Sequence, residues 1–103
     1  MDRYQVVFDL YTGKEYAKVL KTKYKKSLSS MYNIIKRHFI KNDFSWVEGS
    51  TYFSNGEISS RKLNDIIDSL YEKNLWLSYF TRDLKRTIIK VKKSVSINII
   101  KLK

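Results

Sequence analysis

The sequence predicts a single α+β domain, and three observations lead to that fold class. The chain has 103 residues, which is the size of one domain. Apolar residues make up 43% of it and aromatic residues 15%, enough for a core that a disordered chain of similar charge would lack. Segments that alternate like strands are interleaved with segments that repeat like helices. We therefore expect residues 1–103 to form one domain, with its core in about residues 4–92.

Three strands are predicted in the first half of the chain. In residues 4–10 the apolar side chains at even positions share one face, so that Asp9 points to the other face together with Val7. Residues 44–48 and 51–53 follow the same alternation on either side of a Gly-Ser pair. We expect them to form either two strands or one strand interrupted by a bulge.

Two helices are predicted, over residues 27–41 and 60–73. In each, apolar residues recur at intervals of three and four, which places them on one stripe of the helix. Ser27 is a suitable N-cap for the first helix, and Asn74 would close the second. Residues 14–26 show a weaker pattern, which predicts only a short helical turn.

A fourth strand over residues 84–91, rich in β-branched side chains, completes the order β-α-β-β-α-β. This order is that of the split βαβ, or ferredoxin-like, sandwich. Residues 93–103 form a basic tail with strand character over 95–102, which predicts an additional C-terminal strand. Two helices would cover one face of the sheet and leave the other bare, and the bare face predicts a homodimer.

Several kinds of site and segment are excluded by composition. The sequence contains no cysteine, which excludes disulfides, thiolate zinc sites and cysteine nucleophiles. No window approaches the ~20 apolar residues of a membrane span, and the N-terminus shows no signal peptide. We expect a soluble, cytoplasmic protein with no membrane partner and no organic cofactor.

The net charge of +11 is distributed unevenly along the chain. Residues 14–41 hold nine Lys or Arg and one acid, and residues 84–103 hold seven Lys or Arg and no acid. Residues 43–83 hold four bases and seven acids. A coding bias toward lysine could explain part of the excess, but it would not segregate the charge. Localised basic surface attracts polyanions, so nucleic acid, and RNA in particular, is the expected partner.

Asp9 is the first candidate for chemistry, because it ends the first strand and faces the bare side of the sheet. A carboxylate there could bind Mg²⁺ or another divalent cation together with its mate in a dimer, which suits phosphodiester hydrolysis. The alternative is an Asx turn that starts the next loop.

Ser50 and Tyr52 are the second candidates. Their hydroxyls would project from one face of the sheet, and tyrosine rings on a sheet can stack on unpaired RNA bases. The alternative is an aromatic sheet core with a bulge at Gly49.

Arg82 and Asp83, at the entry to the fourth strand, are the third candidates. They could form an ion pair within a turn, or Arg82 could hold a phosphate. His38, the single histidine, cannot form a two-histidine ribonuclease site within one chain. It is expected near the C-terminus of its helix or at the surface.

Together these segments resemble the virulence-associated protein D (VapD) family. The resemblance covers residues 4–91 and rests on Phe8-Asp9-Leu10, on Phe44-x-Trp46-x-x-Gly49-Ser50-x-Tyr52-Phe53 and on Arg82-Asp83-Leu84-Lys85. It implies a ferredoxin-like fold related to the small CRISPR-associated adaptation nucleases. It also implies a homodimeric endoribonuclease that acts like the toxin of a toxin–antitoxin pair. The catalytic positions implied are Asp9, which is also the metal position, Ser50, Tyr52, Arg82 and Asp83.

The sequence therefore predicts an endoribonuclease toxin that cuts RNA, with an antitoxin protein as a further partner. The residues expected to hold the RNA backbone are Lys14, Lys23, Lys25, Lys26, Lys36, Arg37, Lys85 and Arg86. Two alternatives remain at this point. One is a nucleic-acid-binding module of the same fold without catalysis, and the other is a protein-interaction module whose basic surface meets an acidic partner.

Overall fold

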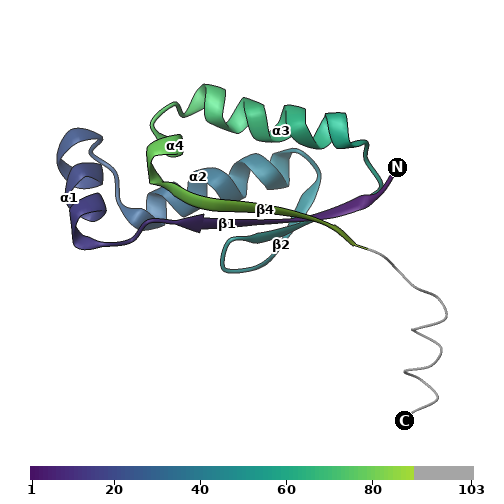
Figure 1. The fold of residues 1–103 in the computed structure, drawn as a ribbon, viewed down its shortest axis with the longest axis horizontal. Coiled ribbons are helices and arrows are strands. Elements are labelled where there is room, and N and C mark those ends of the chain that lie inside the picture. The colour runs from purple at the N-terminus through teal and green to yellow at the C-terminus, as the bar shows by residue number, and fades with distance from the viewer. Residues whose placement is uncertain (90–103) are drawn as a thin grey trace, which may run out of the picture.

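Four antiparallel strands form one sheet in the order β2-β3-β1-β4. The structure is a computed structural model that describes residues 1–89 (Figure 1). The strands are β1 (Arg3–Leu10), β2 (Phe44–Glu48), β3 (Thr51–Ser54) and β4 (Thr81–Ile89). Together with the helices they confirm the α+β class. The predicted C-terminal strand, and the last two residues of the predicted fourth strand, lie outside the described residues.

Strand β1 is one of the two inner strands, and its side chains alternate as predicted. Val6 and Phe8 are buried, Val7 between them is half-buried, and Asp9 is exposed. The buried side chains face the helices, because the long helices pack on that side of the sheet. Asp9 therefore lies on the face that the helices leave open.

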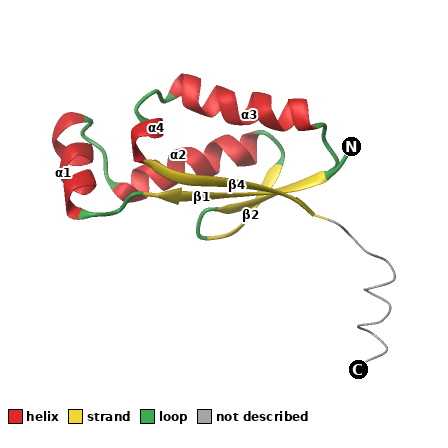
Figure 2. Cartoon of the chain, viewed as in Figure 1, coloured by secondary structure: helices red, strands yellow, loops and turns green. Residues whose placement is uncertain are grey.

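Helices α2 (Leu28–Lys41) and α3 (Ser60–Lys73) lie along the same side of the sheet (Figure 2). Helix α2 begins at the predicted cap: the Ser27 hydroxyl accepts a hydrogen bond from the Ser30 N–H at 3.1 Å, and the Ser27 N–H donates to the Ser30 hydroxyl at 3.0 Å. This reciprocal pair is a capping box, which satisfies N–H groups that have no partner within the helix. Helix α3 ends at Asn74, as predicted.

Residues 14–23 form a full helix, α1 (Lys14–Lys23), where the sequence predicted only a short helical turn. The reason lies in tertiary packing, because Leu20 is buried and Tyr16, Val19 and Tyr24 pack against the core. The surface they meet includes the short helix α4 (Leu77–Phe80). Figure 1 shows α1 and α4 at the same end of the sheet.

The centre of the core is aromatic. Phe39 of α2 stacks on Tyr52 of β3, with ring centroids 4.9 Å apart and planes 15° apart. It meets Phe44 and Phe8 edge-on, at 5.1 Å and 5.6 Å. One side chain of α2 thus contacts three strands. Within residues 1–89, no helix is long and apolar enough to cross a membrane.

Candidate nucleic-acid site

Asp9 and Asp83 lie directly opposite each other on β1 and β4. Side chains of directly opposed residues in an antiparallel pair project from the same face, with Cβ atoms ~5 Å apart. Both side chains are exposed. Two like charges placed in this way repel each other, so the pair needs a cation nearby.

Arg82 supplies that cation. The register of β1 and β4 shifts between Asp9 and Leu10, because Leu10 pairs with Thr81 and Arg82 is left without a partner on β1. Such a bulge re-aims the extra side chain. The Arg82 Nε lies 3.7 Å from the Asp9 Oδ2. The ion pair is therefore between strands, and not the turn pair with Asp83 that the sequence allowed.

Asp83 has a different contact, since its Oδ1 accepts a hydrogen bond from the Leu84 N–H at 2.9 Å. A surface hollow of about 270 Å³ adjoins the two carboxylates, with Val7 and Lys85 also lining it. Lys85 pairs with Val7 across the strands and so projects from the same open face. The two acids thus lie between two cations, Arg82 and Lys85.

Two carboxylates are a donor set that Mg²⁺ can use, because it binds proteins through one or two carboxylates and completes its shell with water and substrate phosphate. Asp9 and Asp83 fit that requirement. No group of three or more His, Cys, Asp or Glu side chains within residues 1–89 could hold a metal without such help. A cation at this pair would compete with Arg82 for Asp9.

Tyr32, in the second turn of α2, lies close enough to Asp9 to sense its charge. Burial raises the pKa of the Tyr32 phenol, and the negative charge of Asp9 raises it further. Tyr32 is not among the residues predicted for the site, because its position in the apolar stripe of the helix predicts a core side chain. No local pattern in the sequence could have indicated its proximity to Asp9.

Tyr52 does not lie on the open face. It pairs with Val6 on one side and with Trp46 on the other, and the alternation of β1 puts the Val6 position on the helix side. Its side chain is 1% exposed, so the prediction that it stacks on RNA bases is wrong. Burial raises the pKa of the Tyr52 phenol.

Ser50 lies in the turn before β3, and its carbonyl accepts a hydrogen bond from the Phe8 N–H at 3.0 Å. Its hydroxyl oxygen is buried and makes no contact of hydrogen-bond geometry with residues 1–89. Ser50 and Tyr52 therefore lie together, as predicted, but beneath the sheet and not beside the carboxylate pair on its open face.

His38 occupies the last turn of α2, as predicted, but it is buried and not at the surface. Its Nε2 lies 2.7 Å from the Ile66 carbonyl oxygen of α3. The ring thus connects the two long helices.

The basic residues predicted to hold RNA fall into separate groups. Lys85 lies on the open face, whereas Arg86 points to the helix side and donates to the Asn64 side chain of α3. On α2, Lys36 and Arg37 line a shallow hollow, and the Lys36 Nζ lies 4.0 Å from the centre of the Trp46 ring. The remaining predicted residues belong to α1 and to the loop that follows it: Lys14, Lys23, Lys25 and Lys26.

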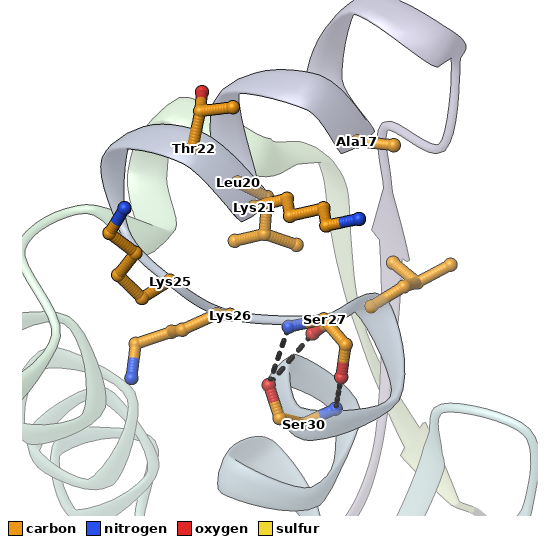
Figure 3. Close-up of a pocket in the computed structure, with 9 residues that line it drawn as sticks. Ala17, Leu20, Lys21, Thr22, Lys25, Lys26, Ser27 and Ser30 are labelled. Atoms are coloured by element: carbon orange, nitrogen blue, oxygen red, sulfur yellow. Dashed lines mark hydrogen bonds between the residues drawn. The ribbon is translucent and has the colours of Figure 1, made fainter.

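A groove of about 970 Å³ separates the end of α1 from the start of α2 (Figure 3). Lys21, Lys25 and Lys26 line it, together with the capping hydroxyls of Ser27 and Ser30. The aliphatic side chain of Leu20 also contributes to its wall. Lysine amines beside hydroxyl groups suit a phosphate chain, so this groove is a basic concave surface on which such a chain could lie.

The sheet, its open face and the carboxylate pair between two cations define a small α+β protein with a basic surface and an acidic centre. The chain matches no protein-family model and no curated protein sequence.

Proposed function

We propose that this chain is a small endoribonuclease of the toxin–antitoxin kind with a ferredoxin-like fold, as the resemblance to the VapD family implies. The observation that carries the proposal is the Asp9–Asp83 pair on the open face, with Arg82 and Lys85 beside it. Hydrolysis of a phosphodiester can use cations that bind the phosphate oxygens, and carboxylates that hold a metal ion or transfer a proton. This surface offers both kinds of group.

The strand order supports the ferredoxin-like assignment. All neighbouring strands are antiparallel, β1 lies between β3 and β4, and α2 and α3 lie on the same side of the sheet. This is the arrangement expected when two βαβ units are interleaved. Helices α1 and α4 are additions to that pattern.

The hydrolysis proposed is a displacement at phosphorus. The oxygen of a water forms a bond to phosphorus, the bond from phosphorus to one ribose oxygen breaks, and a proton passes from the water to that leaving oxygen. Asp9 and Asp83 would hold a divalent cation, which when bound supplies the charge that lowers the pKa of the attacking water. Arg82 and Lys85 would hold the phosphate oxygens.

A homodimer is part of the proposal. Half-buried Val7 and Phe53 lie on the open face, where a second copy would cover them and bring two Asp9 carboxylates toward each other. An antitoxin partner would have to be acidic, because the surface it neutralises is basic.

The test is cleavage of a labelled single-stranded RNA with and without Mg²⁺. Asp9 is exposed, so Asp9→Asn should fold normally and should lose at least about a hundred-fold in rate. Asp65→Asn, which changes an exposed carboxylate on α3, is the matched control and should cut like the unmodified protein. Equal cutting by all three proteins would show that Asp9 has no catalytic role.

The second candidate is a nucleic-acid-binding module that does not cut. The observation in its favour is that Asp9 already has a partner in Arg82, as a structural ion pair would. Binding by the unmodified protein and by Asp9→Asn with the same salt dependence, and cleavage by neither, would favour this candidate.

A further inference from the structure

An aromatic cluster lies at the end of the sheet where α1 and α4 meet. The rings of Tyr11 and Tyr16 stack with centroids 4.5 Å apart and planes 7° apart. The centroid of the Tyr16 ring also lies 5.5 Å from that of Tyr79 and 6.2 Å from that of Phe80. We call Tyr11, Tyr16 and Tyr79 the tyrosine platform.

The platform is open to solvent in a way that the core is not. Tyr11 is 38% exposed and Tyr79 is 54% exposed, whereas Phe80 beneath them is fully buried. Because Tyr16 covers one face of the Tyr11 ring in parallel stacking, the exposure of Tyr11 is concentrated on the other face and the edge. Tyr16 in turn meets the buried Phe80 edge-on, with ring planes 69° apart, so the stacked pair is anchored to the core. The exposed face of such a pair is a surface on which another flat ring can continue the stack.

The platform adjoins the carboxylate site along the chain. Tyr11 follows Asp9 by two residues, and its N–H donates to the Phe80 carbonyl at 2.8 Å. Arg82 follows Phe80 by two residues and pairs with Asp9. Two short chain segments, residues 9–11 and 80–82, therefore link the two sites. A nucleotide whose phosphate lies at Arg82 could place its base against the Tyr11 ring.

The charge around the platform favours a polyanion over an apolar or basic partner. Six lysines and one acid lie in residues 11–26. The lysines are Lys14, Lys18, Lys21, Lys23, Lys25 and Lys26. Aromatic rings among cations on one surface are the combination by which proteins bind single-stranded nucleic acid, with stacking for the bases and charge for the backbone.

We infer that Tyr11 and Tyr79 stack on unpaired bases of single-stranded RNA. This assigns to the platform the role that the sequence analysis gave to Tyr52, which the core covers. The inference deepens the proposed function, on which it rests for its substrate, and it adds a base-binding surface outside the carboxylate pair.

The test measures binding without cleavage. A short single-stranded RNA is compared with an abasic strand of the same length by fluorescence anisotropy, both with the Asp9→Asn protein, in which cleavage should be suppressed. The strand with bases should bind about 5- to 150-fold more tightly than the abasic strand. Replacing both tyrosines, Tyr11→Leu with Tyr79→Leu, should abolish that preference and leave abasic binding unchanged.

Two controls separate stacking from folding. Tyr11→Phe with Tyr79→Phe keeps the rings and should keep the preference for the strand with bases. Leu75→Ala changes the most exposed apolar side chain near α4 and should alter neither affinity.

Three results would overturn the inference. They are equal binding of the two strands by the parent protein, an equal loss for both strands in the leucine variant, and full competition by an acidic polypeptide that the leucine variant no longer binds. The last would identify a protein as the occupant. If the protein prefers the strand with bases but cuts no RNA, the result supports base stacking on the tyrosine platform and contradicts the proposed nuclease activity.

Discussion

At the scale of single residues, the repulsion between Asp9 and Asp83 is the feature with the clearest consequence. Two carboxylates opposed across a strand pair cost stability, and the exposed Arg82 offsets only part of it. Asp83→Asn should therefore raise the free energy of unfolding at neutral pH by a few tenths of a kcal/mol, measured by urea denaturation. The same change should slow RNA cleavage, and Asp65→Asn should do neither. A loss of stability in Asp83→Asn would show that attraction between Asp83 and the nearby cations outweighs its repulsion from Asp9.

His38 gives a prediction for pH. Burial lowers the pKa of its imidazole, the hydrogen bond with Ile66 opposes that shift, and the charges of Lys73 and Lys41 add to it. Because the pKa is lower in the folded state, the unfolded chain binds the proton first as the pH falls. Stability should be complete above about pH 6.5 and should decline below it, down to the folded pKa.

The matched variant is His38→Gln, which can still donate to the Ile66 carbonyl but does not titrate in this range. Thermal melts between pH 7 and pH 5 should show a smaller decline for the glutamine variant than for the parent. An identical decline would assign the pH dependence to other groups.

At the scale of elements, the turn between α1 and α2 contains a residue in an unfavourable conformation. Lys25 has φ of 55°, in the left-handed region that glycine adopts without cost. Lys25→Gly should raise the free energy of unfolding by up to about 1 kcal/mol. Lys18→Gly, in the middle of α1, also removes an exposed lysine charge but should lower the free energy of unfolding by about 1 kcal/mol. If both changes destabilise equally, the Lys25 conformation is not strained.

Sequence periodicity predicts those elements whose causes are local. The alternation of β1, the Ser27 cap and the end of α3 at Asn74 follow from neighbouring residues, and the structure confirms them. Helix α1 could not be predicted at its full length, because its inner face is completed by aromatic residues of α4, more than fifty positions away.

The same distinction between local and long-range causes applies to the candidate site. Asp9 faces the open side because strand alternation is a local rule. The partner of Arg82 depends on a register shift, and the burial of Tyr52 depends on which of its neighbours faces the helices. Both are properties of strand pairing, which a single segment does not encode.

At the scale of the whole molecule, the uneven charge predicts how RNA binding responds to salt. Each phosphate neutralised contributes about −0.7 to the slope of log affinity against log salt for a single strand. Replacing Lys21, Lys25 and Lys26 in the groove of Figure 3 with glutamine should reduce that slope by about two and weaken binding to all sequences alike. Replacing Asn33, Lys36 and Arg37 with alanine tests whether the hollow on α2 contributes separately.

The open face of the sheet predicts the oligomeric state. If a second copy covers it, Val7→Lys should convert a dimer into a folded monomer, measured by light scattering after gel filtration. The circular dichroism spectrum should not change, because Val7 is outside the buried core. A parent protein that is already monomeric at high concentration would remove the dimer from the proposal.

The bulge that leaves Arg82 without a partner makes the site sensitive to chain length as well as to side-chain chemistry. Arg82→Ala should remove one charge and leave all the residue pairs of β1 and β4 in place, because Arg82 belongs to none of them. Deleting Arg82 would instead close the bulge and pull Thr81 and α4 one position along the ladder. The tyrosine platform would move with α4, because the Tyr11 N–H donates a hydrogen bond to the Phe80 carbonyl. The single extra residue therefore acts as a spacer that sets the distance between the place where a base would stack and the place where the phosphodiester would be cut.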